Sequence, residues 1–364
     1  MTRLRLFAAA LVALAFPATA SAQLYEGKAG SAPIIVELDT GDGAPSGRYF
    51  YRSTRLDIAL DGERDADVLK LSARLTGDSL VLRRSGSGWA GTLTTAKGKA
   101  LPVSLTPAVP PAAPAGAPTN LDGYDRMQLA GLRLEPGPAE RIGTRTIRWY
   151  TERRSGTRLF RIEGGYAAAA LHKINAALTV TQWEHVRNWF GCPGYEGGAG
   201  IDSDEAGPVY LDDSWVSYPW LTSWGCAGAA HPDFGVQGVI FDARTGSEVK
   251  LDDLLHFGKT PPPERSDAWY AYRGAAFATG LVALLKRYHP AQMAAPKDDG
   301  CSYDDSDVWS FPQAWFTPDG LFVAAYFARV ARACDAPEWA VIPWRALNGP
   351  AARRPTARPA LRPR

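Results

Sequence analysis

The first third of the chain alternates short apolar runs with turn residues, a pattern typical of β-strands. Six runs predict strands, at residues 34–38, 47–51, 56–60, 68–73, 80–82 and 89–93. Gly- and Asp-containing turn sequences separate them, at residues 40–43, 60–62 and 85–88. No helical periodicity of useful length appears before residue 106. The spacing therefore predicts an antiparallel β-rich domain over residues 23–106 that closes into a small barrel or a curved sheet.

A Pro- and Ala-rich stretch follows this domain, PAVPPAAPAGAP at residues 107–118. Proline cannot donate to a β-ladder and favours extended backbone, so residues 107–121 are predicted to form a linker. The linker leads into a second domain at residues 122–348.

The second domain contains two helical patterns. Residues 166–178 are Ala-rich with apolar residues at helical spacing, and residues 266–288 predict a longer helix that ends at His289-Pro290. The apolar face of the longer helix is predicted to consist of Tyr270, Phe277, Leu281, Leu284, Leu285 and Tyr288. Gly274 falls on the same face, where it would permit a close contact with a neighbouring element.

Strand patterns lie between and after these helices. One strand is predicted at residues 239–241, and a hairpin at residues 314–327 turns at Thr317-Pro318-Asp319-Gly320. Helices and strands do not alternate regularly, which argues against a doubly wound parallel sheet. The pattern predicts an α+β fold in which the N-terminal antiparallel domain is followed by a mixed domain, with two main helices against a sheet.

Both ends of the chain differ from this body. Residues 1–22 have a basic start, an apolar run at residues 6–16 and the small residues Ala20-Ser21-Ala22, which predicts a signal peptide cleaved before Gln23. A transmembrane anchor is disfavoured, because the run is shorter than the ~20 residues that span a bilayer. We therefore expect a periplasmic mature chain without a membrane anchor. Residues 349–364 are rich in Pro and Arg and predict a disordered basic tail.

Charge is distributed unevenly along the chain. The 364 residues hold 40 Lys and Arg against 38 Asp and Glu, a net charge of +2. Without the two arginines of the leader and the five of the tail, 33 basic residues face the same 38 acidic ones, which leaves the body at about −5. Surfaces that bind nucleic acid carry clustered Lys and Arg, so a nucleic-acid partner is not expected.

Four cysteines, Cys192, Cys226, Cys301 and Cys334, lie in the second half of the chain. An even number of cysteines in an exported protein favours disulfides, and three pairings are possible. We favour Cys192 with Cys226 and Cys301 with Cys334, because each pair encloses a loop of about 33 residues. A zinc site is disfavoured, since neither the cysteines nor the histidines have ligand spacing.

One stretch resembles a known family. CAGAAHPD at residues 226–233, followed by VIFDARTGSEVKLDDLL at residues 239–255, is similar to the signature of the RsiV-like family, domain-of-unknown-function family 3298. FTPDGL at residues 316–321 and VIPW at residues 341–344 match the C-terminal pattern of that family. The resemblance covers about residues 210–347, and the segment around Ile174-Asn175 is similar to a companion segment that often precedes the domain.

The resemblance implies a role in envelope binding. The family includes the extracytoplasmic part of an anti-sigma factor that senses lysozyme by binding it, and an accessory domain of a peptidoglycan deacetylase. Neither role is known to use catalytic residues of this domain. This sequence departs from both members, since no membrane helix, sigma-binding segment or deacetylase domain is recognisable in it.

Four residues are candidates for ligand contact: His231, Trp215, Trp220 and Trp224. His231 lies in the loop of the family signature, where it either contacts a ligand or bonds a backbone carbonyl and fixes the loop, the reading we favour. The three tryptophans cluster just before the signature, and exposed tryptophans can stack on sugar rings. Buried tryptophans are commoner in strands, so core packing is the favoured reading for them as well.

The sequence contains no recognisable catalytic constellation. A Gly-x-Ser-x-Gly elbow, a His-Glu-x-x-His motif and a phosphate-binding loop are all absent, and no metal or other cofactor is expected. Asp202, Asp204 and Asp213 fall into a calcium-loop frame, but the frame has Ala206 in place of a ligand and Asp213 in place of the bidentate Glu. This segment is expected to be a solvated loop. A second acidic group, predicted as a solvated face or as a contact for a basic protein, consists of Asp298, Asp299, Asp304, Asp305 and Asp307.

These observations predict an exported, non-enzymatic envelope protein whose C-terminal domain binds a lysozyme-like protein or a cell-wall glycan. Two alternatives stay open. One is a hydrolase or deacetylase acting on envelope polymers, with a site assembled from distant residues. The other is a structural module that joins partners through its β-rich domain. The ligand and the oligomeric state are not determined by the sequence.

Overall fold

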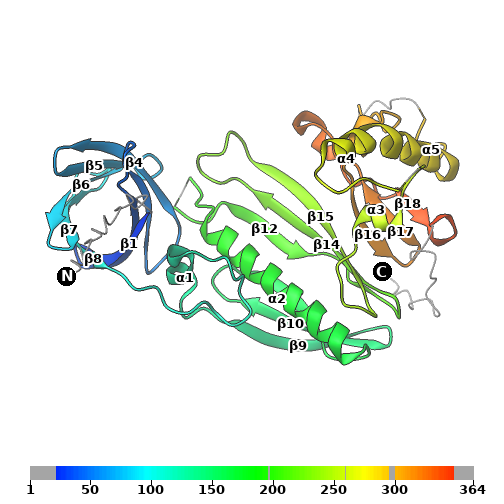
Figure 1. The fold of residues 1–364 in the computed structure, drawn as a ribbon, viewed down its shortest axis with the longest axis horizontal. Helices are drawn as coiled ribbons and strands as arrows, with labels where there is room; N and C mark the ends of the chain where they lie inside the picture. The colour runs from blue at the N-terminus through cyan, green and yellow to red at the C-terminus, as the bar shows by residue number, and fades with distance from the viewer. Residues whose placement is uncertain (1–21, 196, 259, 295–299, 348–364) are drawn as a thin grey trace, which may run out of the picture. The chain divides into compact units, whose positions relative to one another are not determined.

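The computed structural model describes residues 22–195, 197–258, 260–294 and 300–347 (Figure 1). The predicted basic tail and all but the last residue of the predicted signal peptide lie outside these residues, as do Asp298 and Asp299. The described residues form two compact units. The first unit comprises the residues up to Thr54 and Ile58–Val109. The second unit comprises Arg55–Asp57 and the residues from Pro110 onward. No helix among the described residues is both long and apolar enough to cross a bilayer.

The first unit is a closed barrel of antiparallel strands, drawn in blue and cyan in Figure 1. Its strands are β1 (Gln23–Ala29), β2 (Ala32–Asp39), β3 (Ser46–Tyr51), β4 (Ile58–Asp65), β5 (Val68–Ala73), β6 (Asp78–Ser85), β7 (Gly88–Thr94) and β8 (Ala100–Pro107). Each strand pairs with its neighbours in the chain, and β1 also pairs with β8, which closes the barrel. Apolar residues alternate toward the interior, as in β5, where Leu69 and Leu71 are buried and Lys70 is exposed.

The predicted barrel is confirmed, with two differences in its strands. β1 and β8 were not predicted, because neither has a long apolar run and β8 contains Pro102. The turn predicted at residues 60–62 is wrong, since β4 runs through it. Gly62 pairs there with Leu71, and a Cβ at this position would lie 2.1 Å from the carbonyl oxygen of Lys70. Gly62 therefore permits a close approach between strands and does not form a turn.

The second unit contains a larger sheet in the order β13-β14-β12-β11-β10-β9, with β15 on the other edge of β14. Its strands are β9 (Leu134–Ile142), β10 (Arg145–Glu152), β11 (Arg158–Ile162), β12 (Ile201–Ala206), β13 (Tyr210–Leu211), β14 (Trp215–Trp224) and β15 (Asp233–Asp242). Helix α1 (Gly123–Leu129) precedes the sheet, and α2 (Ala168–Phe190) lies across it (Figure 1). The predicted helix at residues 166–178 is thus longer than expected.

β11 and β12 run parallel, and the larger sheet opens between them because they pair over a short stretch. In the described part of the chain their register has one pair, Arg158 with Glu205. Helix α2 supplies partners where a strand would otherwise pair with β11. The side-chain amide of Asn175 accepts from the Ile162 N–H and donates to the Ile162 carbonyl, each at 2.9 Å. Gln182 donates to the carbonyls of Tyr150 and Thr157 at 2.8 and 3.1 Å, so side chains of α2 satisfy buried backbone groups of the sheet.

The C-terminal part adds a small antiparallel sheet of β16 (Gln313–Thr317), β17 (Gly320–Ala324) and β18 (Val341–Pro343). The helical segments around it are α3 (Leu251–Leu254), α4 (Asp267–Tyr272), η1 (Arg273–Phe277), α5 (Ala278–Tyr288), η2 (Asp307–Trp309), η3 (Arg329–Cys334) and η4 (Trp344–Ala346). Phe277, Leu281 and Leu285 pack with Trp309 and Phe316 in its core. The predicted hairpin at residues 314–327 is present as β16 and β17.

The helix predicted at residues 266–288 is three consecutive segments, α4, the π-helical turn η1 and α5. The wider π-turn shifts the helical phase, so Tyr270, predicted to share the face of Phe277, is 50% exposed. Arg273 is directed inward and pairs with Asp252 at 2.9 Å. The close contact that Gly274 would permit is not made, because no atom lies within 4 Å of a Cβ placed there.

Contacts of β14 and β15 with β16 join the larger sheet to the small one. The hydroxyl of Ser217 donates to the Val239 carbonyl at 2.8 Å and accepts from the Phe316 N–H at 2.9 Å. Gly238 approaches β16 so closely that a Cβ would lie 1.9 Å from the carbonyl oxygen of Ala314. The described part of the second unit is therefore a mixed α+β structure, as the pattern predicted, built from two connected sheets.

Candidate functional site

A groove of about 640 Å³ opens where the sheet parts, and we call it the β10–β12 groove. It is lined by residues of β9, β10, β11 and β12, by the β10–β11 turn, by the last turn of α2 and by residues 207–209. Its aromatic members are Trp149 and Trp189, both half-buried. Its charged members are Glu140, Arg158, Asp202, Asp204 and Glu205.

Trp149 is held in place on several sides. Its indole N–H donates to a carboxylate oxygen of Glu140 at 2.9 Å. The guanidinium of Arg158 lies 4.2 Å from its ring centroid, and the Phe160 ring meets it edge-on at 5.8 Å. Trp189 in turn meets Phe190 at 5.0 Å with perpendicular rings. The aromatic walls of the groove are therefore fixed by their neighbours.

Asp204 is the most deeply buried carboxylate of the groove, with a side chain 6% exposed. Its Oδ1 accepts from the Trp220 indole N–H at 2.6 Å, from His185 Nδ1 at 2.8 Å and from the Thr222 hydroxyl at 3.2 Å. The His185 ring stacks on Trp220 with centroids 4.0 Å apart. Since Nδ1 donates to the carboxylate, the second ring nitrogen of a neutral His185 is an acceptor.

The charge of the groove is predominantly acidic. Four carboxylates line it, from Glu140, Asp202, Asp204 and Glu205, against the one guanidinium of Arg158. Asp202 and Glu205 are exposed. Such a surface favours neutral or cationic ligands over anionic ones, because a bound anion would face like charges.

The expectation of a solvated acidic loop at residues 202–213 is wrong for Asp204. Residues 201–206 form β12, which pairs with β14 and thereby brings Asp204 to Trp220 and Thr222. Asp213 pairs with Arg145 at 2.5 Å. No three His, Cys, Asp or Glu side chains are grouped as metal ligands in the described ranges. Of the second acidic group, Asp304, Asp305 and Asp307 are exposed.

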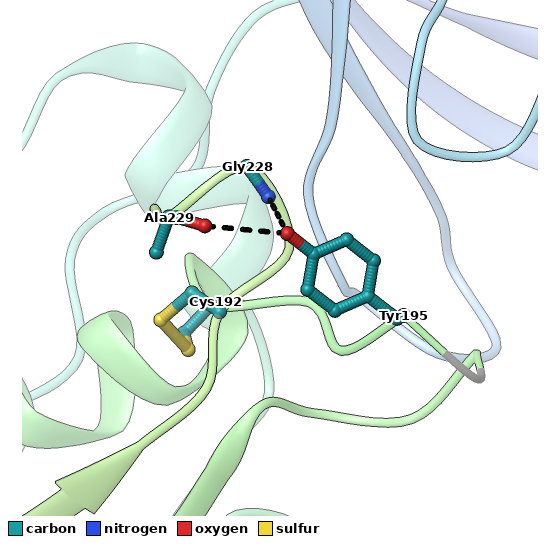
Figure 2. Close-up of a disulfide and its surroundings, with 5 residues drawn as sticks. Cys192, Tyr195, Gly228 and Ala229 are labelled. Carbon is teal, nitrogen blue, oxygen red and sulfur yellow. Dashed lines mark hydrogen bonds between the residues drawn. A yellow bond between two sulfur atoms is a disulfide. The ribbon is translucent and has the colours of Figure 1, made fainter. Parts of the chain in front are cut away.

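The loop at residues 226–233 is anchored by a disulfide between Cys192 and Cys226 (Figure 2). Next to the disulfide, the hydroxyl of Tyr195 accepts from the Gly228 N–H at 3.1 Å and donates to the Ala229 carbonyl at 3.3 Å. Gly228 has a φ of +92°, the left-handed conformation that glycine adopts readily. The second disulfide joins Cys301 to Cys334, so the favoured pairing of the cysteines is confirmed.

His231 lies in this loop, exposed and outside the groove. Its Nδ1 is 3.1 Å from the Pro232 carbonyl oxygen and 3.1 Å from Nε of Arg329. Arg329 also pairs with Asp233 at 3.4 Å. The structure therefore places His231 against a backbone carbonyl and an arginine, and does not bring it to the carboxylates of β12.

The three predicted tryptophans have different positions. Trp215 and Trp220 are buried, at 0% and 2% exposure, so both belong to the core. Trp224, at the end of β14, is half-buried. Trp149, Trp189 and His185 were not singled out from the sequence. A usable signal existed only for Trp149, because the alternation in RTIRWYTE at residues 145–152 predicts a strand with Trp149 on the face of Ile147.

No protein-family model matches this chain, and a comparison with curated proteins finds no similar sequence. The resemblance to the RsiV-like family therefore stays a prediction, carried by the residues at 226–255, 316–321 and 341–344.

Proposed function

We propose that this chain is an exported envelope protein that binds a cell-wall saccharide in the β10–β12 groove. The observation that carries the proposal is the presence of two half-buried tryptophans and several carboxylates in one groove. Sugars present apolar C–H faces that pack on aromatic rings and hydroxyls that donate to carboxylates. Trp149 and Trp189 would supply the rings, and Asp202 and Glu205 the acceptors.

Export is supported by two independent features. The leader has the basic start, apolar run and small-residue site of a signal peptide. The cysteines of the described residues all form disulfides, which persist in oxidising compartments such as a periplasm.

The acidic side chains of the groove favour uncharged or positively charged saccharides over negatively charged ones. Uronic acids and lactyl-bearing sugars carry carboxylates that the four acidic side chains would repel. Neutral N-acetylated sugars and amino sugars fit the charge, since a protonated amine would be attracted to Asp202 and Glu205. We therefore propose an N-acetylglucosamine- or glucosamine-containing glycan as the ligand.

A binding role is supported by the way the groove is held. Trp149 is fixed by Glu140 and Arg158, and Asp204 is engaged by three donors. A site that is rigid before the ligand arrives loses little conformational entropy on binding.

Isothermal titration calorimetry on the mature chain, residues 23–364, tests the proposal. The ligands are the tetramer of N-acetylglucosamine and its fully deacetylated form. Replacing one stacking ring, in Trp149→Leu or Trp189→Leu, should weaken binding about tenfold, which corresponds to about 1.4 kcal/mol. The matched control is Trp224→Leu, because Trp224 is also half-buried but does not line the groove.

Two outcomes would contradict the proposal: no heat of binding with either tetramer, or equal loss of affinity in the Trp224→Leu control. Circular dichroism of each variant shows whether a loss of binding reflects a loss of folding. Binding of a basic protein such as lysozyme, measured in the same instrument, tests the second ligand class expected from the sequence.

A hydrolase is the second candidate, favoured by the carboxylate of Asp204 with His185 behind it. Prolonged incubation of the tetramers with the mature chain, followed by mass spectrometry, distinguishes the two functions. Shorter oligosaccharides or released acetate that disappear in Asp204→Asn would establish catalysis, whereas intact tetramers support the binding role.

A further inference from the structure

Arg161 of β11 is a buried cation whose hydrogen-bond partners are all neutral. The residue is 9% exposed. Its Nε donates to the Thr179 hydroxyl at 2.8 Å. One terminal nitrogen donates to the carbonyl of the preceding residue, Phe160, at 2.7 Å, and the other donates to Gln182 Oε1 at 2.8 Å. Among the described residues no carboxylate lies within ion-pair distance of it. Buried charges are normally paired with an opposite charge, and Arg161 therefore departs from the usual arrangement.

The pKa of Arg161 also reflects the lack of a nearby carboxylate. Burial lowers the pKa of Arg161 to about 10, because the guanidinium has lost hydration. The ionisable groups that counteract the effect are the phenols of Tyr218 and Tyr150, not carboxylates. The protein therefore keeps a positive charge in its interior without supplying a negative charge to offset it.

Arg161 lines a cavity of about 810 Å³, which we call the α2 cavity. This volume lies within the range of about 300–1,000 Å³ that is typical of small-molecule sites. Arg133 and His172 add further polar groups at exposed positions. Glu163 is the one acidic residue among those lining the cavity in the described chain, and its carboxylate pairs with Arg148 at 2.6 Å.

The other walls of the α2 cavity are mostly apolar, and include Leu132, Leu134, Ile162, Val180 and Trp183. Trp183 is itself fixed, because its indole N–H donates to the carbonyl of Ala115 at 3.2 Å. Gly116 lies beside it with a φ of +74°, and a Cβ there would lie 2.5 Å from Thr179 Cγ2. The linker segment thus packs closely onto α2 and forms one wall of the cavity.

We propose that the α2 cavity binds an organic anion with an apolar body, of the class of medium-chain carboxylates. Arginine has five N–H donors, and three of them have the partners named above. One N–H remains on each terminal nitrogen, which matches the two oxygens of a carboxylate. The apolar walls would take the hydrocarbon chain. The site is separate from the β10–β12 groove, with which it shares no lining residue.

Calorimetry with decanoate, decanol and acetate on the chain at residues 23–364 tests the proposal. Decanoate should bind at least tenfold more tightly than decanol, which lacks the charge, and than acetate, which lacks the chain. Arg161→Gln should reduce decanoate affinity at least tenfold and leave decanol affinity unchanged. Equal affinities for decanoate and decanol, or undiminished binding of decanoate by Arg161→Gln, would overturn the proposal.

A second variant keeps the test decisive if Arg161→Gln does not fold. Ala176 is exposed on α2 and lines the cavity, so Ala176→Trp should fill the space and abolish decanoate binding. The matched control is Ala169→Trp, an exposed position of the same helix outside the cavity. In NMR spectra, the Trp183 indole N–H resonance should shift on addition of decanoate. No binding to the wild-type chain, or unchanged affinity in Ala176→Trp, excludes the site.

Discussion

Tyr166 lies between β11 and α2, and its hydroxyl donates to the Asp212 carbonyl at 2.8 Å. The Arg145 guanidinium lies 4.5 Å from its ring centroid. Burial raises the pKa of Tyr166 to about 12, although Arg145 favours the phenolate and opposes the shift. In the unfolded chain a tyrosine titrates near 10. The folded chain therefore holds this proton more tightly than the unfolded chain does.

The sign of the resulting pH dependence follows from this difference. The stability that Tyr166 contributes is complete below pH 10 and is lost as the pH rises from 10 to 12. In Tyr166→Phe the free energy of unfolding should fall less steeply with rising pH over this window than in the wild type. The two slopes should differ by up to about 1.4 kcal/mol per pH unit. Urea denaturation at pH 9, 10, 11 and 12 measures both slopes. Tyr195→Phe, at a residue 69% exposed, is the control, and identical slopes for wild type and Tyr166→Phe would refute the assignment.

Some of the buried and site residues could be predicted from the sequence and others could not. The core positions of Trp215 and Trp220 agree with the favoured reading, because tryptophans in an apolar strand are usually buried. Asp204 could not be placed, since its three donors come from α2 and from β14. Polar side chains far apart in sequence give no local signal. The candidate groove was missed for the same reason, because its walls come from separate elements.

Among the elements, α2 has an uncommon role at the edge of β11. Asn175 replaces a strand partner by satisfying both backbone groups of Ile162. Asn175→Leu should leave these groups without their partners, at a cost of about 2–4 kcal/mol in the free energy of unfolding. Urea denaturation measures the loss, with Lys173→Leu, an exposed position of the same helix, as the control. A loss below about 1 kcal/mol, or one equal to the control's, would show that Asn175 does not fill this role.

The elements with strong periodicity were predicted and those defined by tertiary pairing were not. β5 agrees with its predicted bounds, since its apolar and polar residues alternate. β1 and β8 have mixed composition and exist because they pair with each other and close the barrel. The π-turn η1 was also beyond prediction, because the ion pair between Arg273 and Asp252 involves a segment 21 residues away. Local patterns contain no information about such partners.

At the scale of the whole molecule, the two disulfides both belong to the second unit. The sequence left three pairings open, and the favoured one, which joins cysteines 34 and 33 positions apart, is the pairing present. The barrel contains no cysteine and depends on its own apolar core, which includes Ile34, Tyr49, Leu69 and Leu80. Reducing agents should therefore act on the second unit and leave the barrel intact.

The barrel should also fold without the rest of the chain. A fragment of residues 23–109 contains all eight strands and the complete apolar core, and its size exceeds the ~55–65 residues at which many domains fold alone. We expect cooperative urea unfolding and a dispersed amide NMR spectrum. The control fragment, residues 23–95, lacks β8, which leaves β1 and β7 as open edges and should give an aggregating or unfolded product.

The same fragment tests which unit carries the proposed saccharide site. If residues 23–109 fold but do not bind the glucosamine or N-acetylglucosamine tetramers, saccharide binding belongs to the second unit, where Trp149 and Trp189 lie. If the folded fragment binds the tetramers as tightly as residues 23–364 do, the β10–β12 groove is not the site. A barrel fragment that lacks a cooperative transition would instead show that the closed strand order is insufficient for stability. Closure through β1 and β8 is the physical reason to expect otherwise, because it leaves no strand edge unpaired.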